Sequence, residues 1–164
     1  EKTQIGPAVD DRQFKQNKKY LDEALKKGAK MVAGDEKIDV SSNGFFMRPT
    51  LLIDTDNNMK INREEVFGPI ACVIKANDYD HALAISNDSD FGLTSGIITD
   101  SLKHANHFKR NSQSGCVMIN LPTAGTDYHV PFGGRKASSY GPREQGQYAK
   151  EFFTTVKTSY ISSA

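Results

Sequence analysis

The sequence predicts an α/β fold with an open, mostly parallel sheet and flanking helices. Segments with helical periodicity alternate with short apolar runs, an order typical of βαβ crossovers. The 164 residues are 37% hydrophobic, which is enough apolar side chain for a buried core. The chain contains no internal repeat and no linker, so residues 1–164 are predicted to form a single domain.

The first predicted helix spans residues 11–27, where apolar side chains recur at helical spacing. Asp10 or Asp11 can cap its start, and Gly28 can end it in the left-handed conformation. Three apolar runs then predict strands, at residues 31–33, 50–53 and 70–74. Residues 41–44 (Ser-Ser-Asn-Gly) are a dense turn signal between the first two.

Helices and strands alternate in the second half. A helix is predicted from Asp78, its cap, to Asn87, and a buried strand follows at residues 93–99. Asp100 and Ser101 cap the next helix, which stops near Gly115 and precedes a strand at 116–120. The chain ends with a helix around 143–152 and an alternating, half-exposed strand at 154–161.

Residues 121–140 show no periodicity and contain several Gly, Pro and Ser residues. A loop of twenty residues is long for a compact domain, and such loops are usually functional or disordered.

Charge and cysteine content narrow the class of partner. The net charge is +1, from 21 basic and 20 acidic residues with no long block of either sign. This pattern argues against nucleic acid or a membrane and favours a small molecule. Cys72 and Cys116 both lie in apolar runs, which indicates core packing, a reducing compartment and a cytoplasmic location rather than disulfides or a nucleophile. The start lacks a signal peptide and an initiator Met, so we expect a fragment.

A search for catalytic motifs gives mostly negative results: the sequence has no GxGxxG, P-loop, CxxC, HExxH or GxSxG. His104 and His107 are three residues apart on a helix, but no further ligand lies near them in sequence, so a solvated face is favoured over a metal site.

Two segments resist a purely structural interpretation, residues 63–69 and 131–136. In the first, the acidic pair before a turn is either a solvated surface or a carboxylate aimed at sugar hydroxyls. A carboxylate such as that of Glu65 can accept from two ribose hydroxyls, and Phe67 can form an apolar wall against a nicotinamide or adenine ring. The second segment suits close backbone approach to a ligand or an interface.

Residues 64–69 (Glu-Glu-Val-Phe-Gly-Pro) resemble a signature of the aldehyde dehydrogenase superfamily. The other matching motifs follow in the family's order across nearly the whole chain: Gly6-Pro7, Gly44-Phe45-Phe46 with Pro49-Thr50, Asn87 with Phe91-Gly92-Leu93, Gly115-Cys116-Val117 with Asn120, and Pro131-Phe132-Gly133-Gly134.

The resemblance implies that this chain is the C-terminal part of a catalytic domain that uses NAD or NADP. It implies that Glu65 holds the nicotinamide ribose and that Phe67 flanks the nicotinamide. Phe132 and the loop after Asn120, which anchors it, would line the aldehyde tunnel. No residue matches the family's nucleophilic cysteine, general base or dinucleotide-binding half, so the isolated chain is expected to be inactive. In the family, the cysteine attacks the aldehyde, hydride passes to the nicotinamide and water hydrolyses the thioester.

Residues 137–146 depart from the commonest family pattern, and together with residues 121–125 they resemble the α-ketoglutaric semialdehyde dehydrogenases. This implies a short aldehyde that carries a carboxylate, to which Thr123, Thr126 and Tyr128 could offer hydroxyls. The residue that chooses between NAD and NADP lies outside the chain. The last strand resembles the family's crossing into its oligomerisation arm, which implies a homo-oligomer, a dimer or tetramer.

Two alternatives from other classes stay open. One is a stand-alone α/β module that binds an anion through residues 133–136. The other is a folding and oligomerisation unit without catalysis.

Overall fold

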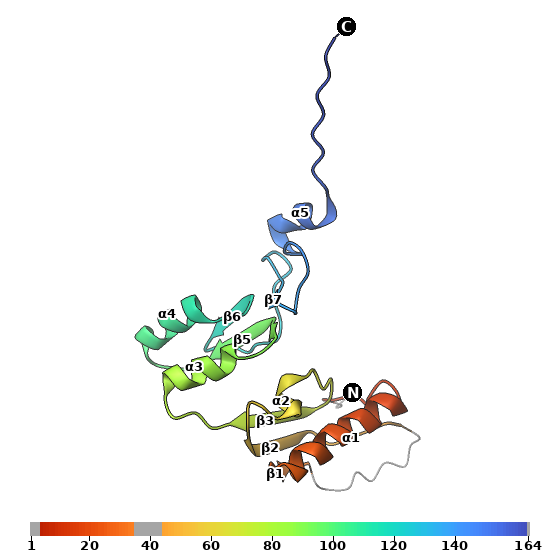
Figure 1. Ribbon diagram of the computed structural model, residues 1–164, viewed down its shortest axis with the longest axis vertical. Helices are drawn as coiled ribbons and strands as arrows, with labels where there is room; N and C mark the ends of the chain where they lie inside the picture. The colour runs from red at the N-terminus through yellow and green to blue at the C-terminus, as the bar shows by residue number, and fades with distance from the viewer. Residues whose placement is uncertain (1–3, 35–43, 164) are drawn as a thin grey trace. The chain divides into compact units, whose positions relative to one another are not determined.

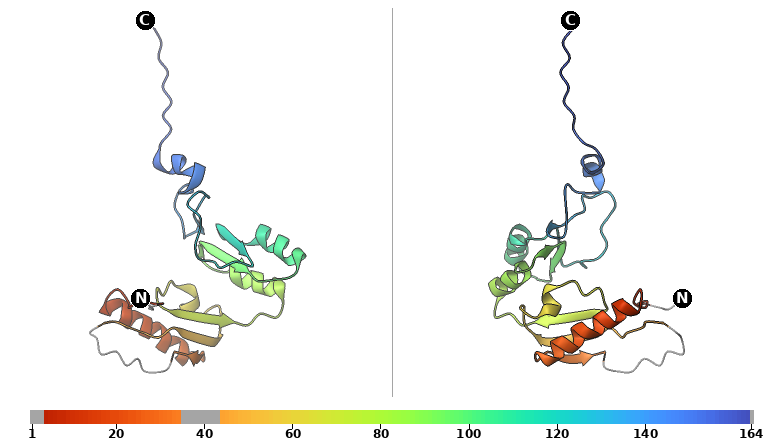
Figure 2. Two further views of the ribbon diagram at one scale, coloured as in Figure 1. Left: turned by 180° about the vertical axis from the view of Figure 1, so that it is seen from behind. Right: turned by 45° about the vertical axis from the view of Figure 1, so that its right-hand side comes forward.

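The computed structural model describes residues 4–34 and 44–163 of the chain. The structure divides into two compact units, Glu1–Asp78 and Tyr79–Ala164, and each is considered by itself (Figures 1 and 2). The predicted turn at residues 41–44 lies almost wholly outside the described residues.

The first unit is one helix-covered sheet (Figure 1). Its elements are α1 (Asp11–Lys26), β1 (Lys30–Ala33), β2 (Thr50–Thr55), α2 (Lys60–Arg63) and β3 (Ile70–Ile74). The strands pair in the order β1-β2-β3, with β1 antiparallel and β3 parallel to the central β2. The predicted strands in this unit are therefore confirmed, although only the β2 and β3 pair is parallel.

Local signals in the sequence account for α1. The Asp10 carboxylate accepts from the backbone N–H of Gln13 at 2.7 Å, and so satisfies a donor in the first turn. After Lys26 the chain turns at Gly28, whose φ of +99° is accessible to glycine without strain. The predicted helix and both of its ends are confirmed.

The core of this unit lies between α1 and one face of the sheet. Leu52, in the central strand, is fully buried and packs in a cluster with Tyr20, Leu21 and Ala24 of α1. Side chains alternate along a strand, so the neighbours of Leu52 face the other way. On that opposite face Val73 remains 48% exposed.

The second unit contains several helices and two short strand pairs, one parallel and one antiparallel. Its elements are α3 (Tyr79–Asn87), β4 (Phe91–Gly92), β5 (Thr94–Ile97), α4 (Leu102–Asn111), β6 (Cys116–Ile119), β7 (Arg135–Lys136), the 3-10 helix η1 (Gly146–Tyr148) and α5 (Ala149–Phe153). Strands β5 and β6 are parallel and are joined through α4, which is the βαβ connection that the sequence predicts. Strands β4 and β7 form a separate antiparallel pair.

Three predictions for the second unit need correction. Helix α4 ends at Asn111 rather than near Gly115, because Ser112 adopts an extended ψ of 134°. The helix predicted around 143–152 begins only at Gly146, whose φ is +63°, as the 3-10 helix η1, and it continues as α5 to Phe153. The loop predicted at 121–140 contains the short strand β7.

The strand predicted at residues 154–161 does not form within the part of the chain that the structure describes. The segment is extended but pairs with no described strand, and Val156 is 98% exposed. An alternating sequence makes a strand only where a neighbouring strand supplies backbone partners.

Among the described residues, no helix is both long and apolar enough to cross a membrane.

Replacing Leu52 with Ala should lower the free energy of unfolding by about 2–5 kcal/mol, because the cavity left in the α1 interface cannot fully collapse. Denaturant unfolding of the protein checks this. Leu52→Met, which conserves the volume, is the matched control and should cost less than about 1.5 kcal/mol. Equal losses for both variants would show that the packing at Leu52 is not tight.

Candidate functional site

The candidate site in the first unit is the turn between α2 and β3. After α2 the chain becomes extended at Glu64, whose ψ is 154°, and it enters β3 at Ile70. The far side of the turn is fixed to the sheet, because the N–H of Thr50 donates to the carbonyl of Pro69 at 2.8 Å. The turn thus carries Glu65 and Phe67 between α2 and the start of β3.

Phe67 has the least usual backbone of this turn. Its φ is +52°, in the left-handed region that a residue with a Cβ rarely adopts, and its side chain is 78% exposed. Glu65 is exposed as well. The turn therefore presents a carboxylate and an aromatic ring to solvent two residues apart.

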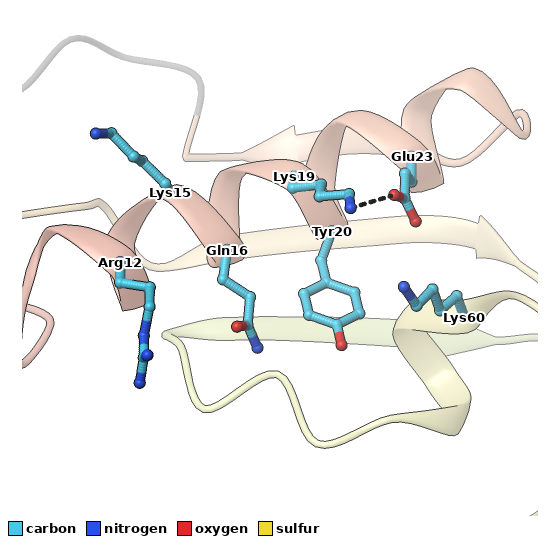
Figure 3. A pocket seen from close by; sticks show the side chains of 7 residues that line it. All are labelled: Arg12, Lys15, Gln16, Lys19, Tyr20, Glu23 and Lys60. Atoms are coloured by element: carbon cyan, nitrogen blue, oxygen red, sulfur yellow. Dashed lines mark ion pairs between the residues drawn. The ribbon is translucent and has the colours of Figure 1, made fainter.

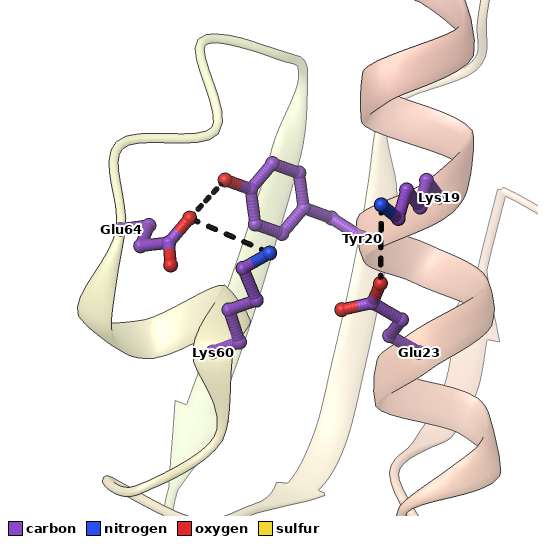
Figure 4. A network of polar contacts seen from close by, with 5 residues as sticks. All are labelled: Lys19, Tyr20, Glu23, Lys60 and Glu64. Carbon is purple, nitrogen blue, oxygen red and sulfur yellow. Dashed lines mark hydrogen bonds and ion pairs between the residues drawn. The ribbon is translucent and has the colours of Figure 1, made fainter.

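The two glutamates of the turn have different surroundings. The Tyr20 hydroxyl of α1 donates a hydrogen bond to the Glu64 carboxylate, and the Lys60 ammonium lies 3.8 Å from the same carboxylate (Figure 4). Glu64 thereby links α1 to the turn. The two glutamates are adjacent in the sequence, and in the structure Glu64 is the one that bonds to α1.

The network raises the pKa of Tyr20 to about 12. The largest cause is the hydrogen bond to Glu64, because the deprotonated phenol could not donate it. Burial of the phenol and the negative charges of Glu64 and Glu23 act in the same direction.

A shallow cavity of about 360 Å³ lies along the outer side of this network (Figure 3). It is lined by Arg12, Lys15, Gln16, Lys19, Tyr20, Glu23 and Lys60. Each lysine has a carboxylate partner: Lys15 pairs with Asp11 at 2.5 Å, Lys19 with Glu23 at 3.9 Å and Lys60 with Glu64. Ion pairs within the unit therefore offset much of the positive charge around the cavity.

In the second unit, Asn120 locks the ends of two strands together. Its side-chain Oδ1 accepts from the N–H of Thr99 at 2.8 Å, and its Nδ2 donates to the carbonyl of Thr99 at 2.9 Å. Its φ is +56°, a conformation that Asn tolerates better than most residues. Asn120 therefore fixes where the following loop leaves the sheet.

The predicted tunnel residues lie on that loop. Thr123 is exposed, whereas Thr126 and Phe132 are half-buried. The Thr123 methyl lies near Gly96 of β5, and the Phe132 carbonyl accepts from the N–H of Glu144 at 3.0 Å. Asn120, Thr123, Thr126 and Phe132 thus belong to the second unit, and Glu65 and Phe67 belong to the first.

The segment 133–136 uses its polar groups within the unit. The Gly134 N–H donates to Ser139 Oγ at 2.6 Å, and the Arg143 guanidinium donates to the Gly134 carbonyl. The Lys136 ammonium donates to two backbone carbonyls, those of Asn87 at 2.6 Å and Ser89 at 2.8 Å. These contacts occupy the Gly134 N–H and the Lys136 ammonium, two of the donors that an anion-binding module would use.

The histidines and cysteines form no reactive cluster in the described ranges. The Tyr79 ring stacks on His104 with centroids 4.3 Å apart, and its hydroxyl lies 2.8 Å from His107 Nδ1. Within residues 4–34 and 44–163, no three His, Cys, Asp or Glu side chains are grouped to hold a metal ion. Both cysteines are half-buried free thiols, and burial raises the pKa of Cys72.

Sequence reasoning missed Gln13, Asn17 and Tyr20, which connect α1 to the turn. Gln13 donates to the Val66 carbonyl at 2.8 Å, and Asn17 is fully buried. A signal was available, since these residues share a helix face with the buried Ala24. Polar side chains on an otherwise apolar helix face indicate that the segment packed against that face has polar groups that need hydrogen-bond partners.

Comparisons with known proteins agree on one family. A model described as "Aldehyde dehydrogenase family" matches residues 1–159. An alpha-ketoglutarate semialdehyde dehydrogenase of Haloferax volcanii is 40% identical over 97% of this chain and 34% of its own length. An alpha-ketoglutaric semialdehyde dehydrogenase of Bacillus subtilis is 35% identical over 96% and 33%. The chain thus spans about a third of the length of these relatives.

Solved structures give the same result. A Mycobacterium tuberculosis aldehyde dehydrogenase complexed with NAD+ superposes with a TM-score of 0.86 at 32% identity, over 98% of this chain and 34% of the other. A mutant indole-3-acetaldehyde dehydrogenase of P. syringae, in complex with NAD+ and IAA, superposes with a TM-score of 0.89 at 32% identity, over 98% and 32%.

Replacing Glu64 with Gln should move the titration of Tyr20 back toward its ordinary pKa, because a neutral amide gives the phenol proton less stabilisation. Since the folded pKa is raised, the stabilisation from this bond should be complete below pH 10 and lost as the pH rises through about 12. Ultraviolet difference titration against Tyr20→Phe isolates the group. Glu65→Gln is the matched control, and an equal effect of both substitutions would contradict the assignment.

Proposed function

This chain belongs to the aldehyde dehydrogenase family, and we propose that it forms part of the catalytic domain of an enzyme that oxidises an aldehyde to a carboxylate with NAD+ or NADP+. The observation that carries the proposal is the turn that presents Glu65 and Phe67 to solvent from a fixed layer. We further propose that both compact units, residues 1–164 together, belong to a single domain in the full-length protein.

Glu65 and Phe67 suit one end of a nicotinamide nucleotide. An exposed carboxylate offers only acceptors, which match the two hydroxyls of a ribose. The Phe67 ring, 78% exposed, offers an apolar surface on which a flat heterocycle can lie. The bound nicotinamide supplies the acceptor for the hydride of the aldehyde. The role of these two residues is to orient that acceptor, which supports the proposal through positioning rather than bond making.

The second unit would contribute the wall of the aldehyde site. Asn120 sets the start of the loop through its two bonds to Thr99, and Thr123, Thr126 and Phe132 follow along that loop. Hydroxyls and an aromatic ring suit a short aldehyde with a polar end. We propose α-ketoglutaric semialdehyde or a similar semialdehyde as the substrate, since relatives at 40% and 35% identity carry that name.

The nucleophile of the reaction would lie outside this chain. Cys72 and Cys116 are half-buried, and a raised pKa leaves the Cys72 thiol with less thiolate at neutral pH. Because the chain spans about a third of its relatives, we propose that another part of the full-length protein supplies the nucleophile and the dinucleotide-binding fold. The isolated chain should then show no turnover.

The C-terminal segment favours self-association. In residues 154–163 the side chains of Val156, Tyr160 and Ile161 are each at least 95% exposed, on a backbone without a strand partner among the described residues. Pairing with another copy would satisfy both the apolar surface and the backbone groups. We propose a homo-oligomer, a dimer or tetramer. Because both cysteines are free thiols, we also propose a cytoplasmic location.

In the full-length protein, Glu65→Gln should lower the rate of hydride transfer about tenfold, equivalent to about 1.4 kcal/mol of lost positioning energy, because an amide holds ribose hydroxyls less firmly than a carboxylate. Single-turnover formation of the reduced cofactor measures this rate. Asp22→Asn, the same change at an exposed residue of α1, should have no effect. Unchanged hydride transfer in Glu65→Gln would remove Glu65 from the site.

A further inference from the structure

We propose that Gln13 and Asn17, two amide side chains on the inward face of α1, are positioning residues that aim the Phe67 ring. This inference rests on the proposed function, because it assigns to Phe67 the role of a wall for the nicotinamide. It assigns a role to two residues that no sequence pattern singles out.

The Gln13 amide reaches both peptide groups that flank Phe67. Its Nε2 lies 2.8 Å from the carbonyl oxygen of Val66 and 3.4 Å from the carbonyl oxygen of Phe67. The same nitrogen lies 2.7 Å from Oδ1 of Asn17. An amide nitrogen carries two hydrogens, so one serves Asn17 and the other is shared between the two carbonyls.

These bonds restrict the backbone of Phe67 from both sides. The Val66 carbonyl belongs to the peptide plane before Phe67, and the Phe67 carbonyl belongs to the plane after it. Holding both planes fixes φ and ψ of Phe67 together, and with them the direction in which the Cβ leaves the chain. The left-handed φ of +52° is the conformation that is held.

Asn17 keeps the Gln13 amide in place. It is fully buried, its Oδ1 accepts from Gln13, and its Nδ2 donates to the sulfur of Met47 at 3.4 Å. A buried amide whose groups have partners has one preferred orientation. The orientation of Asn17 therefore determines where Gln13 can donate.

Gly68 lets the turn lie directly on this pair. A Cβ at Gly68 would lie 2.5 Å from Nδ2 of Asn17, closer than side chains tolerate. The close approach brings the carbonyls of Val66 and Phe67 within reach of Gln13. The turn and the amide pair are thus fitted to each other.

The direction of the Phe67 ring depends on the conformation of its backbone. At 78% exposure, the Phe67 side chain has little packing of its own to hold it. The direction of Cβ is then the main restraint on where the ring points. Without the amide pair, the turn would relax toward a conformation that a residue with a Cβ adopts more readily.

The test uses the full-length protein with Gln13→Glu, which replaces the donor by a carboxylate facing two carbonyls, and Asn17→Leu, which removes the acceptor that orients Gln13. The first readout is amide hydrogen exchange of the peptide that covers residues 64–70, without cofactor. The second is the KM for NAD+ alongside the KM for the aldehyde. Gln113→Glu, the same change at an exposed residue of the second unit, is the matched control.

We expect faster exchange in residues 64–70 and a rise of about tenfold in the KM for NAD+, with the KM for the aldehyde nearly unchanged. In a Phe67→Ala background, Gln13→Glu should raise the KM for NAD+ little further, because the two residues act through one another.

Three outcomes would overturn the proposal. Exchange at wild-type rates would show that the amide pair does not hold the turn. Faster exchange with an unchanged KM for NAD+ would show that the turn does not place the cofactor. Equal rises in both KM values would indicate a general folding role. If the wild-type protein oxidised no aldehyde with NAD+ or NADP+, the proposed function would fail, while the exchange measurement would still decide whether the pair holds the turn.

Discussion

The left-handed backbone conformation of Phe67 is the constraint that the contacts between α1 and the turn must satisfy. A residue with a Cβ in this conformation costs about 1–2 kcal/mol relative to a glycine, so neighbouring interactions must offset the strain. Gln13 supplies them at the two carbonyls, and the Tyr20 hydroxyl holds Glu64 at the start of the turn. The inward face of α1 is therefore divided, with polar side chains opposite the turn and apolar ones, such as Leu21, opposite the sheet.

The second unit satisfies its unusual backbone in a similar way. Asn120 has a positive φ, and its side chain makes two bonds to the backbone of Thr99 in the preceding strand connection. The loop that follows is then held by Arg143 and Ser139 at Gly134. In both units side-chain amides fix the backbone of a segment that carries candidate site residues. Accurate placement of a group in a site requires that the backbone carrying it is held in this way.

Much of the fold could be predicted from the sequence, because local signals determine it. The Asp10 cap and Gly28 define α1, and the apolar run at 70–74 coincides with β3. The strand predicted at 154–161 did not form, since alternation alone supplies no partner strand. The contacts around the candidate site could not be predicted in this way. Glu64 and Glu65 are alike in sequence, and the difference between them arises from Tyr20, which is distant along the chain. The role of Gln13 likewise depends on a contact across 53 residues.

We propose above all that the turn presents Glu65 and Phe67 to a nicotinamide nucleotide. A crystal structure of the full-length protein with NAD+ bound tests it most directly. We expect a Glu65 carboxylate oxygen within about 2.6–3.2 Å of a nicotinamide ribose hydroxyl, and the Phe67 ring against the nicotinamide, with the left-handed φ retained. A bound cofactor whose ribose is held by other residues, with Glu65 and Phe67 facing away, would contradict it.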